Sequence, residues 1–166
     1  MMELEPTYNI GIIGPRSFIA GGHDKVSEFR IKLRHKISTI MCDIKQPYQL
    51  LGLTGCSIGV ESDFCSVCYN LDIPYSSYLP YENMERKWVG LPADIQNNFT
   101  TLLNNATGIL YVSDGPYSPK KVEKKNQKII EDSDLVIYVE TPLSKYDYLM
   151  DNSKDIIRIK FWEFPF

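Results

Sequence analysis

The sequence predicts an α/β domain in which a mostly parallel sheet of five to six strands lies between two layers of helices. Three observations lead to this prediction. Short runs rich in branched and aromatic residues alternate, from end to end, with longer segments whose apolar residues recur every three or four positions. That alternation indicates βαβ units around a parallel sheet. No internal repeat and no Ser/Gly-rich linker interrupts the chain, so we expect one domain over residues 1–166.

The strands are expected where a short apolar run ends in turn residues. The first run ends at Gly14-Pro15, the third at Pro80, and the fourth at the turn over residues 113–116. The expected strands are residues 8–13, 49–54, 73–79, 107–112 and 135–140, with 156–161 as a sixth.

Each helix expected between these strands has one apolar face. The expected helices cover residues 26–44, 60–71, 95–103 and 119–131, with a short helix or turn over 146–152. Helices on both faces of a parallel sheet would make the fold Rossmann-like, a three-layer α/β/α arrangement. The helix over 119–131 carries the one basic cluster, which we interpret as a solvated face. The cluster comprises Lys120, Lys121, Lys124, Lys125 and Lys128.

Composition narrows the class of protein. Apolar residues make up 43% and charged residues 23%, typical of a globular domain, and no apolar run is long enough to cross a bilayer. The chain begins with acidic residues and has no apolar leader pattern, so we expect cytoplasmic residence and no membrane partner. Eighteen basic against 21 acidic residues give a net charge of −3, which does not favour nucleic acid as a partner.

The cysteines do not indicate a metal site. Cys65 and Cys68 form a C-x-x-C pair, but no second Cys or His pair stands at zinc-ligand spacing. Both fall on an expected helix among apolar residues, so we predict that they are small, buried apolar residues. We expect the chain to hold neither a metal nor a cofactor.

Candidate site residues follow the strands, because ligands of open α/β sheets bind at the carboxyl ends of the strands. After the first strand, an Arg in the Gly14-Pro15-Arg16-Ser17 segment can fork onto a phosphate or carboxylate. After the second, Gly55 and Gly59 can expose backbone N–H groups at a helix N-terminus. The first segment could also be an ordinary tight turn with a surface arginine. Glu61, in the first turn of the expected helix after Gly59, could simply complement the helix dipole.

Two further strand ends carry candidates. Tyr81 and Trp88 are placed to stack on a base, or to act as a hydrophobic lid. Asp114 can bind ribose hydroxyls, or it can be an ordinary turn residue. Asn126 can orient a ligand, or it can be an ordinary polar residue of the helix. The full set of candidate ligand-binding residues is Gly14, Arg16, Ser17, Gly55, Cys56, Ser57, Gly59, Glu61, Tyr81, Trp88, Ser113, Asp114 and Asn126.

In this order of motifs the chain resembles the YpsA-like branch of the SLOG superfamily, which is related to the DprA nucleotide-binding core and the Lonely Guy phosphoribohydrolases. The matching segments are Gly14-Pro15-Arg16-Ser17-Phe18, Thr54-Gly55-Cys56-Ser57-Ile58-Gly59-Val60-Glu61, Leu79-Pro80-Tyr81-Glu82 with Trp88, Tyr111-Val112-Ser113, Lys125-Asn126 and Asp132-Ser133-Asp134-Leu135-Val136-Ile137. The resemblance implies a nucleotide or nucleotide-derived ligand.

The chain also departs from that family. The branch usually has Asp at position 61 and Arg at position 125, where this chain has Glu61 and Lys125. Many relatives have a Gly-Gly-Thr loop after the fifth strand, but here residues 140–144 read Glu-Thr-Pro-Leu-Ser. Pro142 offers no N–H, and Glu140 would repel a phosphate if it faced the site. The Lonely Guy catalytic signature is absent as well.

Three hypotheses of function follow. The first is a module that binds an ADP-ribose-like metabolite or nucleotide signal, sensing or sequestering it without turnover. The second is an enzyme that cleaves or transfers an N-glycosidic bond, with Glu61 and then Asp114 as the catalytic carboxylates. The third is a protein-interaction module with a vestigial pocket. It is suggested by the apolar segment over residues 157–166, which either packs on its own sheet or docks onto another subunit of a homo-oligomer.

Overall fold

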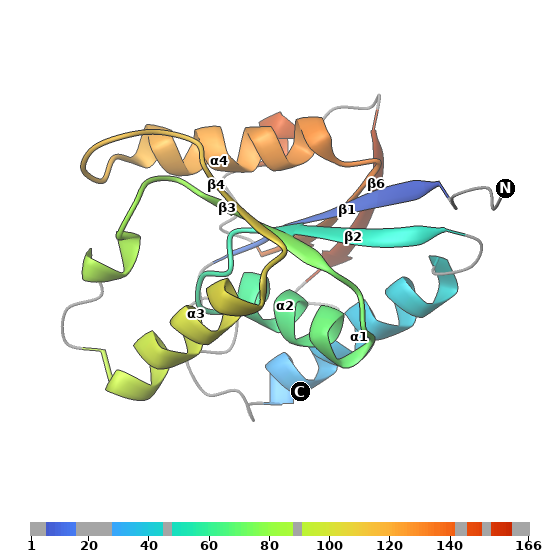
Figure 1. Cartoon of the computed structure of the whole chain (residues 1–166). Helices are drawn as coiled ribbons and strands as arrows, with labels where there is room; N and C mark the ends of the chain where they lie inside the picture. Colours follow the sequence, from blue (N-terminus) through green and yellow to red (C-terminus); the bar gives the residue numbers. More distant parts are fainter. Residues whose placement is uncertain are drawn as a thin grey trace, which may run out of the picture.

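The six strands of the protein form one sheet in which every pair is parallel (Figure 1). The computed structural model describes residues 6–15, 28–44, 48–87, 91–141, 146–150 and 154–160. Across the sheet the strand order is β4-β3-β2-β1-β5-β6. The bounds are β1 (Thr7–Ile13), β2 (Gln49–Thr54), β3 (Tyr75–Leu79), β4 (Gly108–Tyr111), β5 (Leu135–Glu140) and β6 (Asp155–Lys160). The predicted α/β class with a parallel sheet is confirmed.

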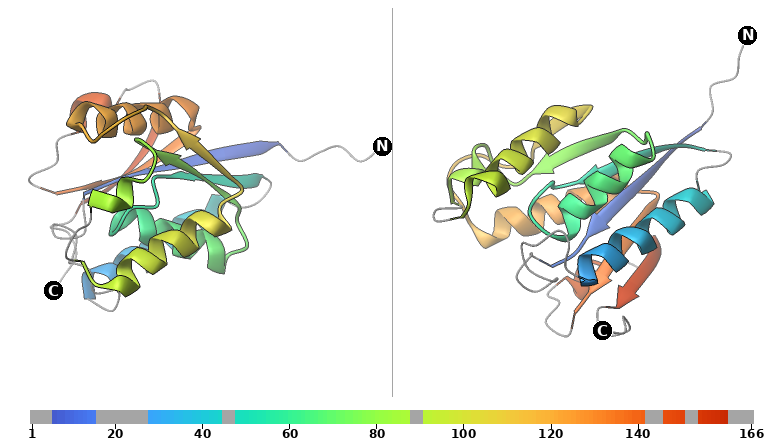
Figure 2. Two further views of the ribbon diagram at one scale, coloured as in Figure 1. Left: turned by 60° about the vertical axis from the view of Figure 1, so that its left-hand side comes forward. Right: turned by 90° about the horizontal axis from the view of Figure 1, so that it is seen from below.

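Helices cover both faces of this sheet (Figures 1 and 2). One face carries α1 (Glu28–Ile44), α2 (Val60–Asn70) and α3 (Ala93–Asn105), and the other carries α4 (Pro119–Asp132). Two short 3-10 helices complete the elements, η1 (Met84–Lys87) and η2 (Asp147–Leu149). The three-layer Rossmann-like arrangement is therefore confirmed. Within the described residues, no helix is both long and apolar enough to cross a membrane.

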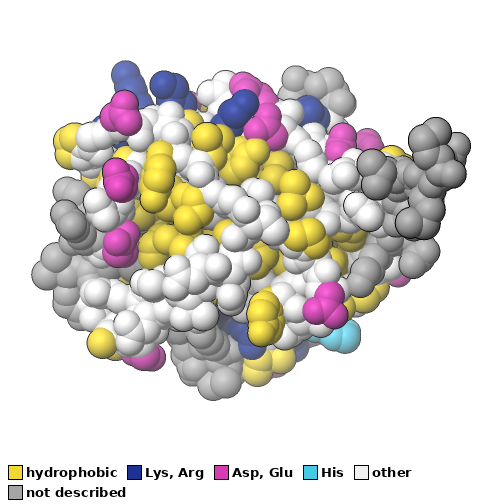
Figure 3. Space-filling view, viewed as in Figure 1, with side chains coloured by type: hydrophobic (Ala, Val, Ile, Leu, Met, Phe, Trp, Pro, Cys, Tyr) yellow, Lys and Arg dark blue, Asp and Glu magenta, His cyan; other side chains and the backbone are white. Residues whose placement is uncertain are grey.

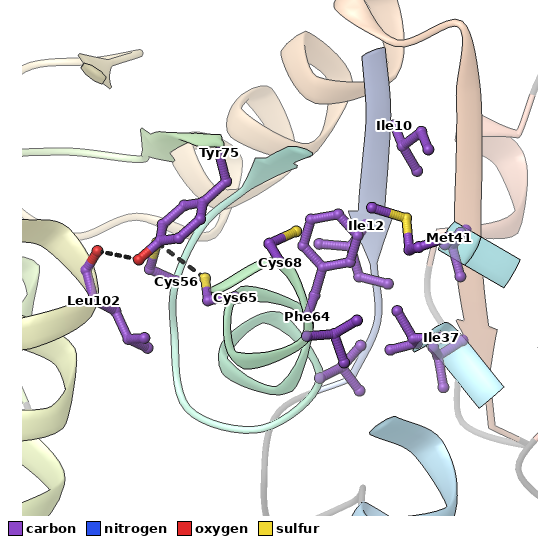
Figure 4. Packing of buried hydrophobic residues seen from close by; sticks show 14 of the residues in the cluster. Ile10, Ile12, Ile37, Met41, Cys56, Phe64, Cys65, Cys68, Tyr75 and Leu102 are labelled. Atoms are coloured by element: carbon purple, nitrogen blue, oxygen red, sulfur yellow. Dashed lines mark hydrogen bonds between the residues drawn. The ribbon is translucent and has the colours of Figure 1, made fainter. Parts of the chain in front are cut away.

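The central strand β1 divides the core into its two layers. Ile10 and Ile12 point toward α1 and α2, where they join the larger apolar cluster with Phe64 (Figure 4). Ile13 points the other way and joins the smaller cluster under α4, which includes Ile129. This alternation is the period-two pattern of a strand buried on both faces.

The strand order fixes where a ligand is expected. The chain moves outward from β1 through β2 and β3 to β4, then crosses back to β5 on the other side of β1. The direction of winding therefore reverses between β1 and β5, and such reversals open a crevice at the carboxyl ends of the strands. The ends of β1, β2 and β5 meet at this edge, together with the loop that leads into α2.

Candidate functional site

The loop from β2 into α2 lies at the carboxyl edge of the sheet and has an unusual backbone. Gly59, the residue before α2, has φ 106°, and Cys56 has φ 60°, both in the region that favours glycine. Local hydrogen bonds hold this shape. The Cys56 N–H donates to the Thr54 hydroxyl at 3.1 Å, and the Gly59 N–H donates to the Ser62 hydroxyl at 3.1 Å.

Glu61, in the first turn of α2, folds back under this loop. Its carboxylate accepts a hydrogen bond from the Ser57 N–H at 3.2 Å and another from the Ser57 hydroxyl. Its other oxygen lies 2.5 Å from the Lys125 ammonium. A Cβ added to Gly55 would lie 2.7 Å from both carboxylate oxygens, so the carboxylate fits because residue 55 has no side chain.

The Glu61–Lys125 ion pair joins the two helix layers. Glu61 is on α2 and Lys125 on α4, which cover opposite faces of the sheet, so the pair passes the end of the strands. Both side chains are buried, with exposed fractions of 7% and 6%. Burial by itself would raise the pKa of the Glu61 carboxyl, but the charge and hydrogen bond of Lys125, with the Ser57 hydrogen bonds, outweigh it and lower the pKa. Glu61 is therefore an anion at neutral pH.

Lys125 corrects one prediction from the sequence. The lysines of α4 were interpreted as a solvated face, but Lys125 is buried. Its position in the helix explains the error. Lys125 stands three residues after Val122 and four before Ile129, which places it on the inner face of the helix. The sequence shows this spacing, but the lysine was assigned to the solvated face because of its charge.

Three backbone N–H groups near the start of α2 have no acceptor within the described residues. The N–H groups of Ile58, Val60 and Glu61 donate to no acceptor in the described part of the chain, whereas the amides of Ser62 and Asp63 bond to the carbonyls of Ser57 and Gly59. The first N–H groups of a helix carry its positive partial charge. Together these groups form the kind of site at which a helix N-terminus binds an anion.

A second buried charge cluster fixes α2 against α1, and the sequence analysis missed it. Arg30, only 2% exposed, donates from two nitrogens to the Asp63 carboxylate, both at 2.9 Å. Arg34 donates to the same carboxylate at 2.8 Å, and Arg30 also reaches the Ser62 hydroxyl at 3.1 Å. The signal in the sequence was a pair of arginines one helical turn apart, next to the apolar face of the helix. Its partner on another helix could not be identified from local pattern.

The other predicted site residues are spread along the same edge. A Cβ on Gly14 would lie 2.6 Å from a Val60 methyl, so this glycine lets β1 end close against α2. Asn126 is buried beside Lys125 on α4, and Tyr81 is buried with its ring edge-on to Tyr117 at 6.3 Å.

The remaining candidates are less closely connected to the loop. Ser113 is half-buried and donates its N–H to the Pro80 carbonyl at 3.1 Å. Asp114 is exposed, and its backbone carbonyl accepts a hydrogen bond from Lys121. Three predicted residues, Arg16, Ser17 and Trp88, lie outside the described residues.

Two other expectations from the sequence can be compared with the structure. Cys65 and Cys68 are fully buried, as predicted, and burial raises the pKa of both thiols. Glu140, at the end of β5, is buried and forms an ion pair with Arg158 of β6. Its carboxylate therefore has a cationic partner on the neighbouring strand, which reduces any repulsion of a phosphate at the edge.

A hollow of about 540 Å³ lies away from this edge, beside the second half of α4 and η2. Its lining includes Ile130, Leu149 and Lys154. The Lys154 ammonium is already engaged with the carbonyls of Glu131 and Ser133 at the end of α4. We therefore place the candidate site at the loop before α2, where open donors and a buried ion pair meet, and not in this hollow.

No family model matches the chain, and no curated protein matches its sequence.

Proposed function

We propose that the chain binds a nucleotide or a nucleotide-derived metabolite such as ADP-ribose, with a phosphate group at the loop before α2. The observation that carries the proposal is the set of three N–H groups at the start of α2 that have no acceptor among the described residues, beside the buried Glu61–Lys125 pair. The resemblance of the sequence to the YpsA-like branch of the SLOG superfamily supports the same ligand class.

The electrostatics of the loop favour an anion. The positive end of α2 points into the edge, and Lys125 neutralises Glu61, which would otherwise place a negative charge directly below the open donors. A phosphate at this position replaces the missing acceptors without meeting an uncompensated carboxylate. The carboxyl edge of a parallel sheet, next to a reversal of winding, is also where α/β folds of this type bind ligands.

Binding without turnover fits Glu61 better than catalysis does. One of its carboxylate oxygens accepts hydrogen bonds from Ser57, and the other pairs with Lys125. A nucleophile or general base needs a lone pair directed at the substrate and a pKa near the working pH, but Glu61 is buried and its pKa is lowered. Glu61 acts in this proposal as a positioning residue for the loop and for Lys125.

The first experiment recovers the ligand from the protein itself. We would purify the full chain, denature it and identify the released small molecules by mass spectrometry, then repeat this after incubation with AMP, ADP and ADP-ribose. An intact nucleotide-like species in near-stoichiometric amount supports the proposal. Free base with a sugar phosphate would instead indicate the N-glycosidic enzyme. If the protein carries no ligand and binds none of these nucleotides, the protein-interaction module is the remaining hypothesis.

A set of charge variants tests the position of the phosphate. In Lys125→Met, Glu61 is left without its counter-ion, and we expect calorimetric affinity for the recovered ligand to fall at least about tenfold. The double variant Glu61→Gln, Lys125→Met removes the repulsion and should recover most of that loss. The control is Lys128→Met, one turn along the same helix and partly exposed, which should bind as the wild type does. Equal affinity in all three variants would refute this placement of the phosphate.

A further inference from the structure

The edge strand β4 and the helix before it, α3 from Ile95 onward, form a surface without charge. No Asp, Glu, Lys or Arg occurs from Ile95 to Ser113, although 23% of the chain is charged. After Asp94 in its first turn, the outward residues of α3 are uncharged and polar, among them Asn97, Thr101 and Asn104. Depletion of charge, with uncharged polar residues around an apolar centre, is the composition of a protein–protein interface.

The apolar centre of this surface is β4 itself. Ile109, Leu110 and Tyr111 are exposed by 45%, 42% and 45%. Ile109 and Tyr111 lie beside Ser77 and Leu79 of β3, and successive residues of a strand alternate in direction, so Leu110 points to the opposite face. Figure 3 shows apolar side chains at the centre of the face on which β3 and β4 are seen in Figure 1, with charged side chains toward its margins.

β4 also lacks the usual protection of an edge strand. It is the last strand of the described sheet, paired only with β3, so its other edge presents unpaired backbone groups. Exposed edges are normally protected by a lysine, a proline or a bulge, or are covered by another element. The sequence of β4, Gly-Ile-Leu-Tyr, contains neither lysine nor proline. An apolar and unprotected edge of this kind indicates a partner strand.

We infer that the partner is a second copy of this chain, whose β4 pairs antiparallel with the first across a twofold axis. A twofold interface places the same patch on both subunits, so the patch must be complementary to itself. A surface without charge meets this condition because no like charges face each other, whereas it offers no attraction to a charged partner. The pairing would join two six-stranded sheets into one continuous sheet.

The size of the contact requires α3 to take part. A stable interface buries about 800 Å² on each partner, contributed by roughly 20–30 residues. β4 has only four residues, so the uncharged side of α3 must supply much of the contact. This dimer does not depend on the proposed ligand, and its test needs no ligand.

Sedimentation velocity of the full chain over a concentration series tests the inference. The wild type should sediment as a dimer of the 19.1 kDa chain. Ile109→Lys and Leu110→Lys each place a charge close to the twofold axis, near the same charge on the other copy, and should raise the dimer dissociation constant at least about tenfold. The control is Tyr69→Lys, at a tyrosine of α2 that is 64% exposed, which should leave the dimer intact. Far-UV circular dichroism checks that each variant is folded.

Cross-linking tests the geometry of the same dimer. In a Cys42→Ser background, which removes the exposed native thiol, Ile109→Cys or Leu110→Cys should form a self-disulfide with a mild thiol oxidant, because residues near a twofold axis face their own copies. Tyr69→Cys should not. A monomeric wild type overturns the inference. So does a dimer that survives both lysine variants, because its contact would then lie elsewhere, for example in the apolar segment over residues 157–166.

Discussion

Removing Lys125 should destabilise the protein strongly, and by an amount that depends on pH. In Lys125→Met, the Glu61 carboxylate stays buried without its counter-ion. Breaking a buried ion pair by removing one partner costs about 3–5 kcal/mol. Glu61 and Lys125 are each more than nine-tenths buried, so this range applies without a large correction for solvent screening.

The dependence on pH follows from the direction of the pKa shift. In the wild type, the folded-state pKa of Glu61 lies below its ordinary value of 4.5, so the pair stabilises the fold above that pH and the contribution is lost as the pH falls through the folded-state pKa. Without Lys125, burial dominates and should raise the folded-state pKa instead. The variant then loses stability as the pH rises above 4.5, whereas in the wild type the contribution of Glu61 is lost as the pH falls.

Urea denaturation followed by far-UV circular dichroism measures both effects. We expect Lys125→Met to lose about 3 kcal/mol or more near pH 7 and much less near pH 4. The double variant Glu61→Gln, Lys125→Met should recover most of the loss, and Lys128→Met, at a partly exposed pair, should stay within about 0.5 kcal/mol of wild type. A loss in Lys125→Met that is below about 1 kcal/mol, or the same at both pH values, would refute the reasoning.

The same denaturation assay checks two further predictions. Gly55→Ala should destabilise by about 1–3 kcal/mol, because its Cβ would lie 2.7 Å from the Glu61 carboxylate oxygens. Gly108→Ala should be within about 0.5 kcal/mol of wild type, since its Cβ meets nothing closer than 3.9 Å, and equal losses would contradict the steric argument. Arg30→Met should cost about 3 kcal/mol and Arg34→Met about 1 kcal/mol or less, because Arg34 keeps a quarter of its side chain in solvent. The reverse order would show that Arg34 holds the helices together.

Local pattern was sufficient for the fold because each element carries its own signal. A short apolar run that ends at Gly14-Pro15 predicted β1 almost to the residue, and the periodic face of α1 predicted its end at Ile44. Errors fall at boundaries. The third strand was expected from Ile73, but β3 begins at Tyr75, after Pro74, which has no N–H for the ladder and contributes only its carbonyl, to the Gly52 N–H at 2.9 Å.

The site was harder to predict because its defining contacts are long-range. Glu61 was recognised as important, but its partner stands 64 residues away. The spacing from Val122 and Ile129 places Lys125 on the inner face of its helix, but nothing in a local window specifies which carboxylate of another layer it meets. The Arg30–Asp63 contact was missed for the same reason, since it joins residues 33 positions apart. Strand ends predict where a site lies, whereas tertiary packing decides which side chains meet there.

The two buried charge clusters together explain why the start of α2 is so firmly placed. Glu61 is held from α4 through Lys125, and Asp63, two residues on, is held from α1 through Arg30. Well-packed apolar residues can provide equal or greater stability than a buried ion pair, because desolvation offsets much of the attraction between the charges. Stability alone therefore does not explain two such pairs within one helical turn. What apolar contacts do not provide is a fixed direction for each partner, and that direction sets where the open N–H groups of Ile58, Val60 and Glu61 point. We infer that the clusters orient this loop. The proposed ligand site would need such an orientation to present several donors to one ligand group.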